Sequence, residues 1–183
     1  MKDAKIHLLD KTFKPYIPHD RIIEAIEDVA ERINADFRGC KDVPVVLCVL
    51  NGSIPFTGEL LQRLDFNCQV VSIKMSSYQG TQSTGTVLKV MGLTSEVRGR
   101  RVIICEDIVD TGNTIVALKE MLLDQEGAAD VRICTMLLKP DVYKKSVKLD
   151  YVGMSIPNAF IVGFGLDYNE LGRNIPDIYV IDE

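Results

Sequence analysis

Residues 102–114, VIICEDIVDTGNT, determine the fold that this chain is expected to adopt. The β-branched apolar run at the start is followed by Glu106 and Asp107, and Asp110 comes three residues later. A Thr-Gly-Asn-Thr sequence (111–114) then precedes an apolar segment of helical period. This order predicts a buried strand, a tight turn and the start of a helix.

The same stretch suggests a phosphate site. Gly112 allows the backbone to turn where a side chain would obstruct it. Free N–H groups at the start of the following helix suit a phosphate, and the hydroxyls of Thr111 and Thr114 lie on either side of Asn113. The acids nearby would repel a phosphate unless they hold hydroxyls, a cation or developing positive charge on the same ligand. A ribose phosphate bound with Mg²⁺ offers all three.

A simpler interpretation is that Asp110 or Thr111 caps the helix, where acids near the first turn also interact favourably with the helix dipole. For an isolated Asp-Thr-Gly sequence, a cap is the better interpretation. For the whole stretch it is the weaker one, because a buried strand gains no stability from ending in Glu106-Asp107 and then adding Asp110.

Composition predicts a globular protein with one domain, residues 1–183. A chain of 183 residues buries roughly 70% of its unfolded surface. The net charge of −5 argues against nucleic acid as a partner, and no apolar segment approaches the length of a membrane span. The N-terminus has no signal-peptide features, and the five cysteines form no C-x-x-C pair, so free thiols in a reduced cytoplasm are expected.

The hydrophobic pattern predicts strands that alternate with helices. Strands are expected near 44–50, 70–73, 86–91, 102–105, 131–137, 151–153, 160–163 and 178–181, helices near 20–37, 56–64 and 113–123, and a polar loop at 76–85. This order predicts an α/β fold with a mostly parallel twisted sheet flanked by helices on both faces. Its ligand is expected beyond the carboxyl ends of the strands.

The stretch at 102–114 resembles the ribose-phosphate motif of the purine phosphoribosyltransferases, in particular their hypoxanthine-guanine branch, and the similarity extends from about residue 20 to the C-terminus. These enzymes join a free purine base to 5-phosphoribosyl-1-pyrophosphate (PRPP) with Mg²⁺, and they release pyrophosphate and a nucleoside monophosphate. The resemblance implies the type I phosphoribosyltransferase fold, with a small hood formed by the terminal segments. It also implies a homodimer or homotetramer.

Asn51 and Gly52 follow the buried strand at 44–50. Alone, they indicate an ordinary Asn-Gly turn. The resemblance instead makes them the pyrophosphate loop, which often contains a cis peptide, here between Leu50 and Asn51. Some members carry Lys where this chain has Asn51, so backbone donors and Mg²⁺ would have to compensate for the missing charge.

The polar loop at 76–85 has two interpretations. It is either a plain solvated connection or, given its length, its two glycines and its place before the acidic motif, a lid. In the family, a Ser-Tyr pair, here Ser77 and Tyr78, closes over the reacting centre and excludes water.

Lys139 follows the strand at 131–137. A lone Lys after a strand is usually solvated, but the resemblance makes Lys139 the donor to the exocyclic oxygen of a 6-oxopurine, which selects hypoxanthine and guanine over adenine. The next residues depart from members that have Arg where this chain has Tyr143, and no role is assigned to Tyr143.

Residues 156–170 form the second strong similarity. Alone, Phe160 would be a core aromatic; by resemblance it stacks on the purine, and the backbone of Ile161 contacts the edge of the base. By resemblance, Asp167 takes the place of a residue that contacts Mg²⁺, often through water, and the exocyclic group of the base. Arg173 takes that of a pyrophosphate contact, which its forked donors suit.

Together these assignments give a mechanism as a hypothesis. Residues 111–114 hold the 5′-phosphate, and Glu106 and Asp107 hold the ribose hydroxyls and, with Asp167, Mg²⁺. Asp110 transfers a proton at N7 of the purine, which frees N9 to attack the anomeric carbon.

Three rival interpretations remain open to test. An aspartate-nucleophile phosphatase requires Asp-x-Asp near the first strand, whereas this motif lies in mid-sequence. A nucleotide-sensing regulator with the same fold, which binds RNA or DNA without catalysis, fits poorly with the acidic balance and with the carboxylate of Asp110. A phosphoribosyltransferase for another base is disfavoured by the set Lys139, Phe160 and Asp167.

Overall fold

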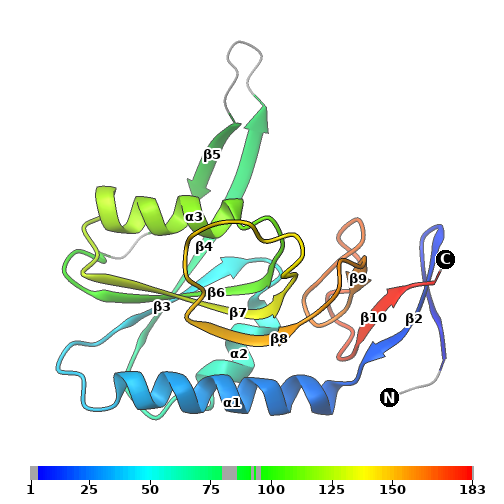
Figure 1. The fold of residues 1–183 in the computed structure, drawn as a ribbon, viewed down its shortest axis with the longest axis horizontal. Helices are drawn as coiled ribbons and strands as arrows, with labels where there is room; N and C mark the ends of the chain where they lie inside the picture. Colours follow the sequence, from blue (N-terminus) through cyan, green and yellow to red (C-terminus); the bar gives the residue numbers. More distant parts are fainter. Residues whose placement is uncertain (1–3, 80–85, 92, 94–95, 183) are drawn as a thin grey trace.

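The computed structural model describes residues 4–79, 86–91, 93 and 96–182. Its main sheet consists of β3 (Val45–Leu50), β4 (Gln69–Gln79), β5 (Thr86–Met91), β6 (Arg101–Val109), β7 (Asp130–Leu138) and β8 (Tyr151–Ser155). Their order across the sheet is β5-β4-β3-β6-β7-β8. All neighbouring pairs are parallel except β4 and β5, which confirms the mostly parallel sheet (Figure 1).

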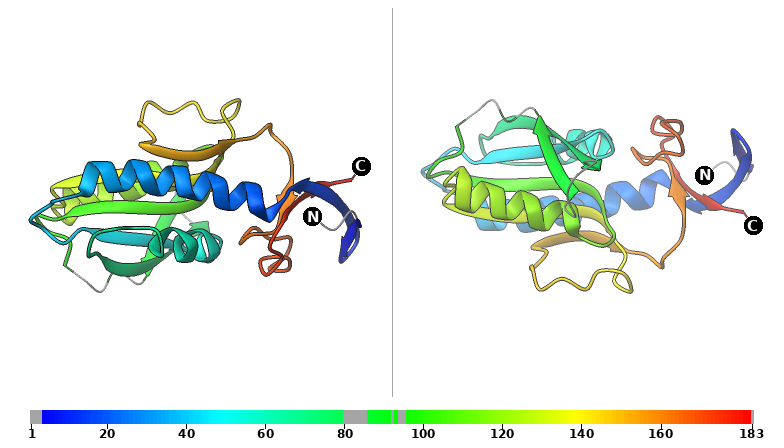
Figure 2. Two further views of the ribbon diagram at one scale, coloured as in Figure 1. Left: turned by 90° about the horizontal axis from the view of Figure 1, so that it is seen from below. Right: turned by 90° about the horizontal axis from the view of Figure 1, so that it is seen from above.

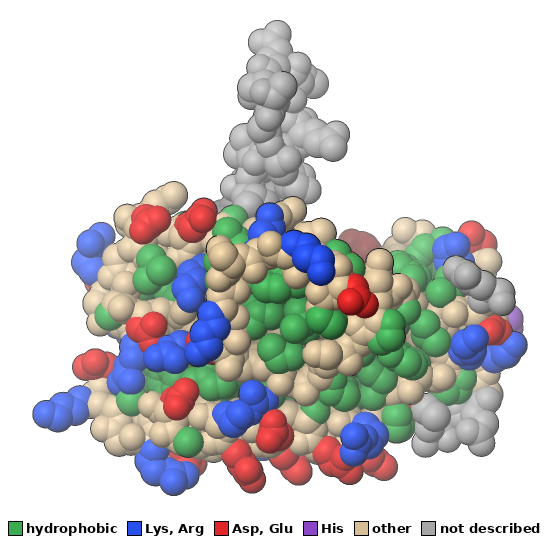
Figure 3. All heavy atoms as spheres, in the orientation of Figure 1, with side chains coloured by type: hydrophobic (Ala, Val, Ile, Leu, Met, Phe, Trp, Pro, Cys, Tyr) green, Lys and Arg blue, Asp and Glu red, His purple; other side chains and the backbone are tan. Residues whose placement is uncertain are grey.

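Helices cover both faces of this sheet, as predicted. The helices α1 (His19–Phe37) and α2 (Ile54–Leu61) lie on one face, and α3 (Asn113–Glu120), extended by the π-helical segment η1 (Met121–Gln125), lies on the other (Figure 1). The inner side of α1 buries the apolar positions that the sequence placed there, including Ile22, Ile26 and Ile33. Its outer side carries acidic and basic side chains along the lower border of the molecule (Figure 3).

Alternate residues of the central strands pack on opposite faces, which explains why these strands are apolar throughout. Val46 and Ile103 are neighbours in adjacent strands and pack with α1 and α2. Leu47 and Ile104 are the next pair and pack with Ile115 of α3.

The predicted hood is a second, antiparallel sheet of order β1-β2-β10-β9 at one end of the molecule (Figure 2). It consists of β1 (Ile6–Leu8), β2 (Lys11–Ile17), β9 (Ile161–Val162) and β10 (Ile178–Ile181), so both ends of the chain meet there. Ile17, Ile161 and Ile178 belong to the same buried cluster as α1. Within the described residues, no helix combines the length and apolar character needed to cross a membrane.

Some elements differ from the prediction. The sequence did not predict β1 and β2, because Pro15 interrupts β2; it is tolerated where the pairing with β10 shifts register beside Tyr179. Predicted boundaries of two helices were also wrong. The helix expected at 56–64 begins at Ile54 and ends at Leu61; proline suits a first helical turn, and Pro55 lies there. The helix expected at 113–123 continues as η1.

The prediction of a loop at 76–85 was wrong for 76–79, which belong to β4. Beyond Lys74, the last partner of β3, β4 pairs with β5 alone, as in Ser77 with Leu88 and Tyr78 with Val87. This hairpin projects from the body of the sheet (Figure 1), so its polar sequence carries no buried-strand pattern. Residues 80–85 lie outside the described residues.

Candidate active site

The acids Glu106 and Asp107 lie within β6, not after it, so the expected end of this strand at 105 was wrong. The pairing of β6 with β3 ends at Cys105, opposite Cys48, whereas its pairing with β7 continues to Val109. One side of β6 is therefore free of a partner strand beyond Cys105. The acids occupy this open part, at the carboxyl ends of the parallel strands, where the ligand was expected.

Glu106 carries a shielded carboxylate oxygen, Oε2, that has no hydrogen-bond partner among the described residues. Burial and the neighbouring charge of Asp107 raise the pKa of Glu106 well above its ordinary value. An unpaired buried acceptor is unfavourable unless a ligand supplies its partner. A hydroxyl or a hard cation would satisfy it.

Asp107 is shielded as well, and burial raises its pKa, although the charge of Arg173 acts in the opposite direction. Its Oδ1 accepts a hydrogen bond of 2.7 Å from the backbone N–H of Ile108. Its Oδ2 faces Gly52, where an added Cβ would stand only 1.5 Å from this oxygen. The loop after β3 therefore reaches the acids of β6 because residue 52 has no side chain.

Three segments meet at this point. The peptide between Leu50 and Asn51 is cis, as the resemblance implied. Gly165, at φ +95°, packs against the backbone of Gly52: a Cβ on Gly165 would lie 1.8 Å from the Gly52 carbonyl oxygen. Sequence reasoning missed Gly165, for which the closely spaced glycines at 163 and 165 were the available signal.

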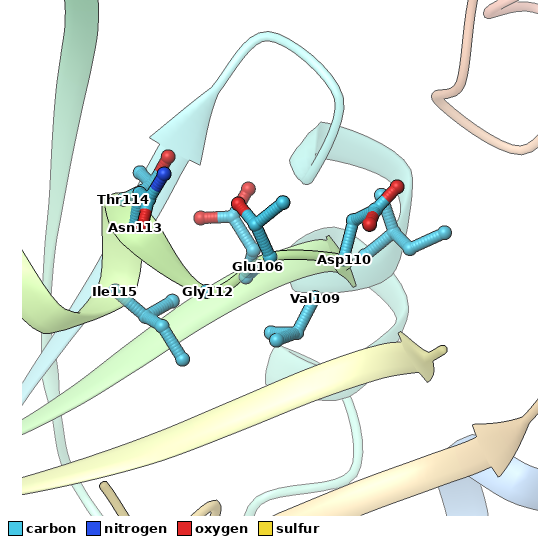
Figure 4. Close-up of a pocket in the computed structure, with 9 residues that line it drawn as sticks. Glu106, Val109, Asp110, Gly112, Asn113, Thr114 and Ile115 are labelled. Carbon is cyan, nitrogen blue, oxygen red and sulfur yellow. The ribbon is translucent and has the colours of Figure 1, made fainter. Parts of the chain in front are cut away.

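The Thr-Gly-Asn-Thr turn forms a hollow of about 100 Å³, lined by Glu106, Asp110 and the whole turn 111–114. Gly112 has φ +80° and precedes α3, which has no side-chain cap. The first helical hydrogen bond runs from the N–H of Val116 to the Gly112 carbonyl, so earlier N–H groups of the helix stay available. In Figure 4 the carboxylates of Glu106 and Asp110 point to the same side of β6, and Asn113 and Thr114 stand beside them.

Lys139 contacts Asp110, one of the residues that line this hollow. It is 9% exposed, so the interpretation as a solvated side chain does not hold. Its Nζ lies 3.2 Å from Oδ2 of Asp110 and 3.3 Å from Oδ1 of Asn158. An ammonium has three donors, so one N–H is left for a ligand. Sequence reasoning assigned no role to Asn158, since an Asn in a loop gives no local signal of its partner.

Phe160 is 45% exposed, which excludes a place in the core. Its ring is supported from within the hood by Phe13 and Tyr168, with ring centroids 6.0 and 5.8 Å away. Ile161 follows as the first residue of β9 and pairs with Val180. The arrangement presents an aromatic face near the edge of the hood.

Asp167 and Arg173 form an ion pair, with Oδ1 and Nη2 2.6 Å apart. Arg173 also donates from Nη1 to the Gly165 carbonyl at 2.7 Å, and the other oxygen of Asp167 accepts from the N–H of Glu170. Within the described part of the chain, no three His, Cys, Asp or Glu side chains gather closely enough to hold a metal ion by themselves. Asp167 thus does not form a ready-made cluster with Glu106 and Asp107.

Known proteins resemble this chain in both sequence and fold. The profile of the phosphoribosyl transferase domain matches residues 16–169. The chain is 40% identical over 175 residues to a hypoxanthine-guanine phosphoribosyltransferase of Lactococcus lactis, covering 94% of this chain and 93% of the relative. It is 39% identical over 171 residues to the protein of the same name from Streptococcus pneumoniae, covering 93% of each.

A solved structure supports the same relationship. The crystal structure of a hypoxanthine phosphoribosyltransferase from Staphylococcus aureus superposes on this chain with a TM-score of 0.83 at 33% identity. The match covers 92% of this chain and 91% of that one.

Proposed function

The chain belongs to the phosphoribosyltransferase family, in its hypoxanthine-guanine branch, and from this premise we propose that it transfers the 5-phosphoribosyl group of PRPP to a 6-oxopurine. The products are pyrophosphate and IMP or GMP, so the reaction serves purine salvage. One observation carries the proposal. Oε2 of Glu106 has no hydrogen-bond partner among the described residues, and it lies near the start of α3, whose first N–H groups have no side-chain cap. One ligand with both hydroxyls and a phosphate satisfies both features.

The turn 111–114 binds the 5′-phosphate of PRPP. The N–H groups that precede Val116 have no helical acceptor, and the positive end of the helix dipole attracts an anion. The hydroxyls of Thr111 and Thr114 add donors at the rim of the hollow.

Glu106 and Asp107 bind the ribose hydroxyls and a Mg²⁺ ion. The donor set fits, because Mg²⁺ prefers carboxylate oxygens and one of those here is buried without a partner in the described part of the chain. A bound Mg²⁺ would supply positive charge that offsets the negative charge of the leaving pyrophosphate. Asp167 is held by Arg173, so we propose that it contacts the ion through water.

The pair Lys139 and Asp110 recognises the purine. On a 6-oxopurine, O6 and N7 are adjacent atoms of one edge, and a donor and a carboxylate 3.2 Å apart match that edge when N7 carries a proton. Adenine would place an amino group against the ammonium, leaving donors unpaired. Phe160 stacks on the ring, and the backbone of Ile161 contacts its far edge.

Asp110 accepts the N7 proton as N9 attacks the anomeric carbon. The leaving pyrophosphate is bound by the backbone of Asn51 and Gly52 and by Arg173. The carboxylates of Glu106 and Asp107 stabilise positive charge that develops on the ribose. Ser77 and Tyr78, on the projecting part of β4, close over the site and exclude water.

Three further properties belong to the same proposal. Residues 1–183 act as a single domain, supported by the buried cluster that hood and main sheet share. The protein works in a reduced cytoplasm, supported by five free cysteines. It assembles as a homodimer or homotetramer. The non-catalytic regulator gains no support, since the relatives are named as enzymes.

The test is to incubate the protein with PRPP and Mg²⁺ and, separately, adenine, hypoxanthine, guanine and xanthine, and to measure nucleotide and pyrophosphate. Nucleotide is expected with hypoxanthine or guanine and not with adenine. Formation with adenine alone, or no formation with any base, would refute the proposal.

A further inference from the structure

The segment after β7 folds back over the phosphate-binding turn. A Cβ placed on Gly112 would lie 2.4 Å from Cε2 of Tyr143 and 3.3 Å from Cγ of Lys145. These two side chains therefore lie against the backbone of the turn, on the side where a glycine leaves room. We call residues 143–147 the clip.

Tyr143 fixes the clip at two points. Its backbone N–H donates to the Lys139 carbonyl at 3.0 Å, and its hydroxyl donates to the Val147 carbonyl. The side chains of Tyr143 and Val147 also pack against the buried cluster beneath α3. The backbone of Lys145 is thus held between two anchored residues.

The hollow itself contains no cationic side chain among the described residues that line it. Its lining includes the acids Glu106 and Asp110, and the rest is apolar or neutral. The charge of Asp110 is offset by Lys139, and this pairing leaves no positive charge for a phosphate that carries up to two negative charges.

We propose that Lys145 is a binding residue for the 5′-phosphate of PRPP and that Tyr143 is the residue that positions it. Lys145 is exposed, and none of the ion pairs or hydrogen bonds within the described residues involves its ammonium. Lys145 is not among the residues that line the hollow, but its Cγ lies beside Gly112 of the turn, and the flexible chain beyond Cγ is long enough to bring the ammonium to a phosphate bound there. This inference rests on the proposed function, because it deepens the account of the same site.

The matched variants are Lys145→Gln and Lys144→Gln. Both remove one positive charge from an exposed side chain, but Lys144 points its Nζ toward the Pro140 carbonyl at 3.5 Å and not toward the turn. Exposed ion pairs are worth up to about fivefold in affinity, and charge-assisted hydrogen bonds more than about tenfold. Lys145→Gln is therefore expected to raise the KM for PRPP about five- to tenfold, less at high salt, with kcat and the KM for hypoxanthine within about twofold.

Tyr143→Phe keeps the ring over Gly112 and removes the bond to Val147. It is expected to raise the KM for PRPP about two- to threefold, and to have no further effect when combined with Lys145→Gln. A structural role alone would give the same loss in both backgrounds. Lys145→Arg, which keeps the charge, is expected to bind PRPP nearly as well as the unchanged protein.

Direct binding separates the failure of this inference from failure of the proposed function. Ribose 5-phosphate and ribose are titrated into each variant; Lys145→Gln is expected to lose affinity about five- to tenfold for ribose 5-phosphate and not for ribose. Equal affinities for ribose 5-phosphate in Lys145→Gln and Lys144→Gln would overturn the inference, even if nucleotide is formed. An unchanged protein that forms no nucleotide refutes the proposed function, while the titration still decides the role of Lys145.

Discussion

Replacing Gly52 by alanine probes the contact that joins the loop after β3 to the acids of β6. The new Cβ would lie 1.5 Å from Oδ2 and 2.6 Å from Cγ of Asp107. Both distances are far inside van der Waals contact. Either the carboxylate swings away and loses its hydrogen bond from Ile108, or the loop retreats from β6.

Each response has a known range of energy. Losing a hydrogen bond to a charged acceptor costs about 1.5–3 kcal/mol, and overpacking a tight contact costs about 1–3 kcal/mol. The two are alternatives, so Gly52→Ala is expected to reduce the free energy of unfolding by about 2–3 kcal/mol. In a domain of this size that lowers Tm by about 5–10 °C. Because the carboxylate or the loop moves by an ångström or more, kcat/KM for PRPP falls about a hundredfold.

The assay compares thermal unfolding and nucleotide formation with a control on the neighbouring helix. Gly58 lies in α2, and an added Cβ there would meet nothing within 4 Å, so Gly58→Ala is expected to stabilise the protein by about 0.5–1 kcal/mol and leave activity unchanged. A second control uses Asp107→Ala. In that background the obstructing carboxylate is gone, so adding Gly52→Ala should cost little further stability.

Two results would rule out a clash between residue 52 and Asp107. One is a Gly52→Ala protein that unfolds at the same temperature as Gly58→Ala and retains its kcat/KM. The other is a Gly52→Ala effect on Tm that is as large with Asp107→Ala as without it, which would place the strain elsewhere.

Three further predictions concern the charged groups. Asp110→Asn is expected to lower kcat about a hundredfold or more while the KM for PRPP stays within about twofold; equal losses in both would mean that Asp110 only caps the turn. Burial and the charge of Asp107 raise the pKa of Glu106. Above a pH of about 4.5 the unfolded chain releases the proton of this carboxyl group, whereas the folded protein keeps it, so stability falls as pH rises. Glu106→Gln should therefore unfold at a higher temperature than the unchanged protein at pH 7–8, and at the same temperature at pH 4. It should also form less nucleotide. A difference in Tm that stays constant from pH 4 to pH 8 would contradict the raised pKa of Glu106. Asn158→Ala is expected to raise the KM for hypoxanthine about threefold and to leave the KM for PRPP unchanged. Asn158→Asp keeps an acceptor for Lys139, so its KM for hypoxanthine should stay near the unchanged value. Steady-state kinetics with each substrate varied in turn test this, and a rise in both KM values together would indicate a structural role instead.

The main sheet was predictable because its signals are local. Continuous apolar runs identify strands that are covered on both faces, and the period of α1 identifies its buried side. The acids of β6 were recognised as a site for the same reason, since charged residues in such a run have no structural use. Their position inside the strand was not predictable. It depends on the pairing of β6 with β7, which continues to Val109 after the pairing with β3 has ended at Cys105, and no pattern in residues 102–114 records this.

Contacts between distant segments account for the rest. Gly165 is needed because the Gly52 carbonyl, far earlier in the chain, lies beside it. Asn158 meets Lys139, and the ring of Tyr143 meets Gly112, only because the fold brings these distant segments together. The strand β2 was missed because Pro15 is acceptable there only at the irregular pairing with β10.

An acidic protein that binds a polyanion must limit the negative charge that the free site presents. Here the carboxylates at the site are balanced in different ways. Lys139 pairs with Asp110, Arg173 pairs with Asp167, and burial favours the protonated form of Glu106. We expect arriving PRPP and Mg²⁺ to compete for the partners at Arg173, Asp167 and Glu106, because the pyrophosphate attracts the guanidinium and the metal attracts the carboxylates. Side chains that neutralise one another in the free protein then neutralise the phosphates and the metal ion in the complex. It follows that binding of PRPP with Mg²⁺ should release a proton from Glu106, so its affinity should rise with pH over the range in which Glu106 is protonated in the free protein.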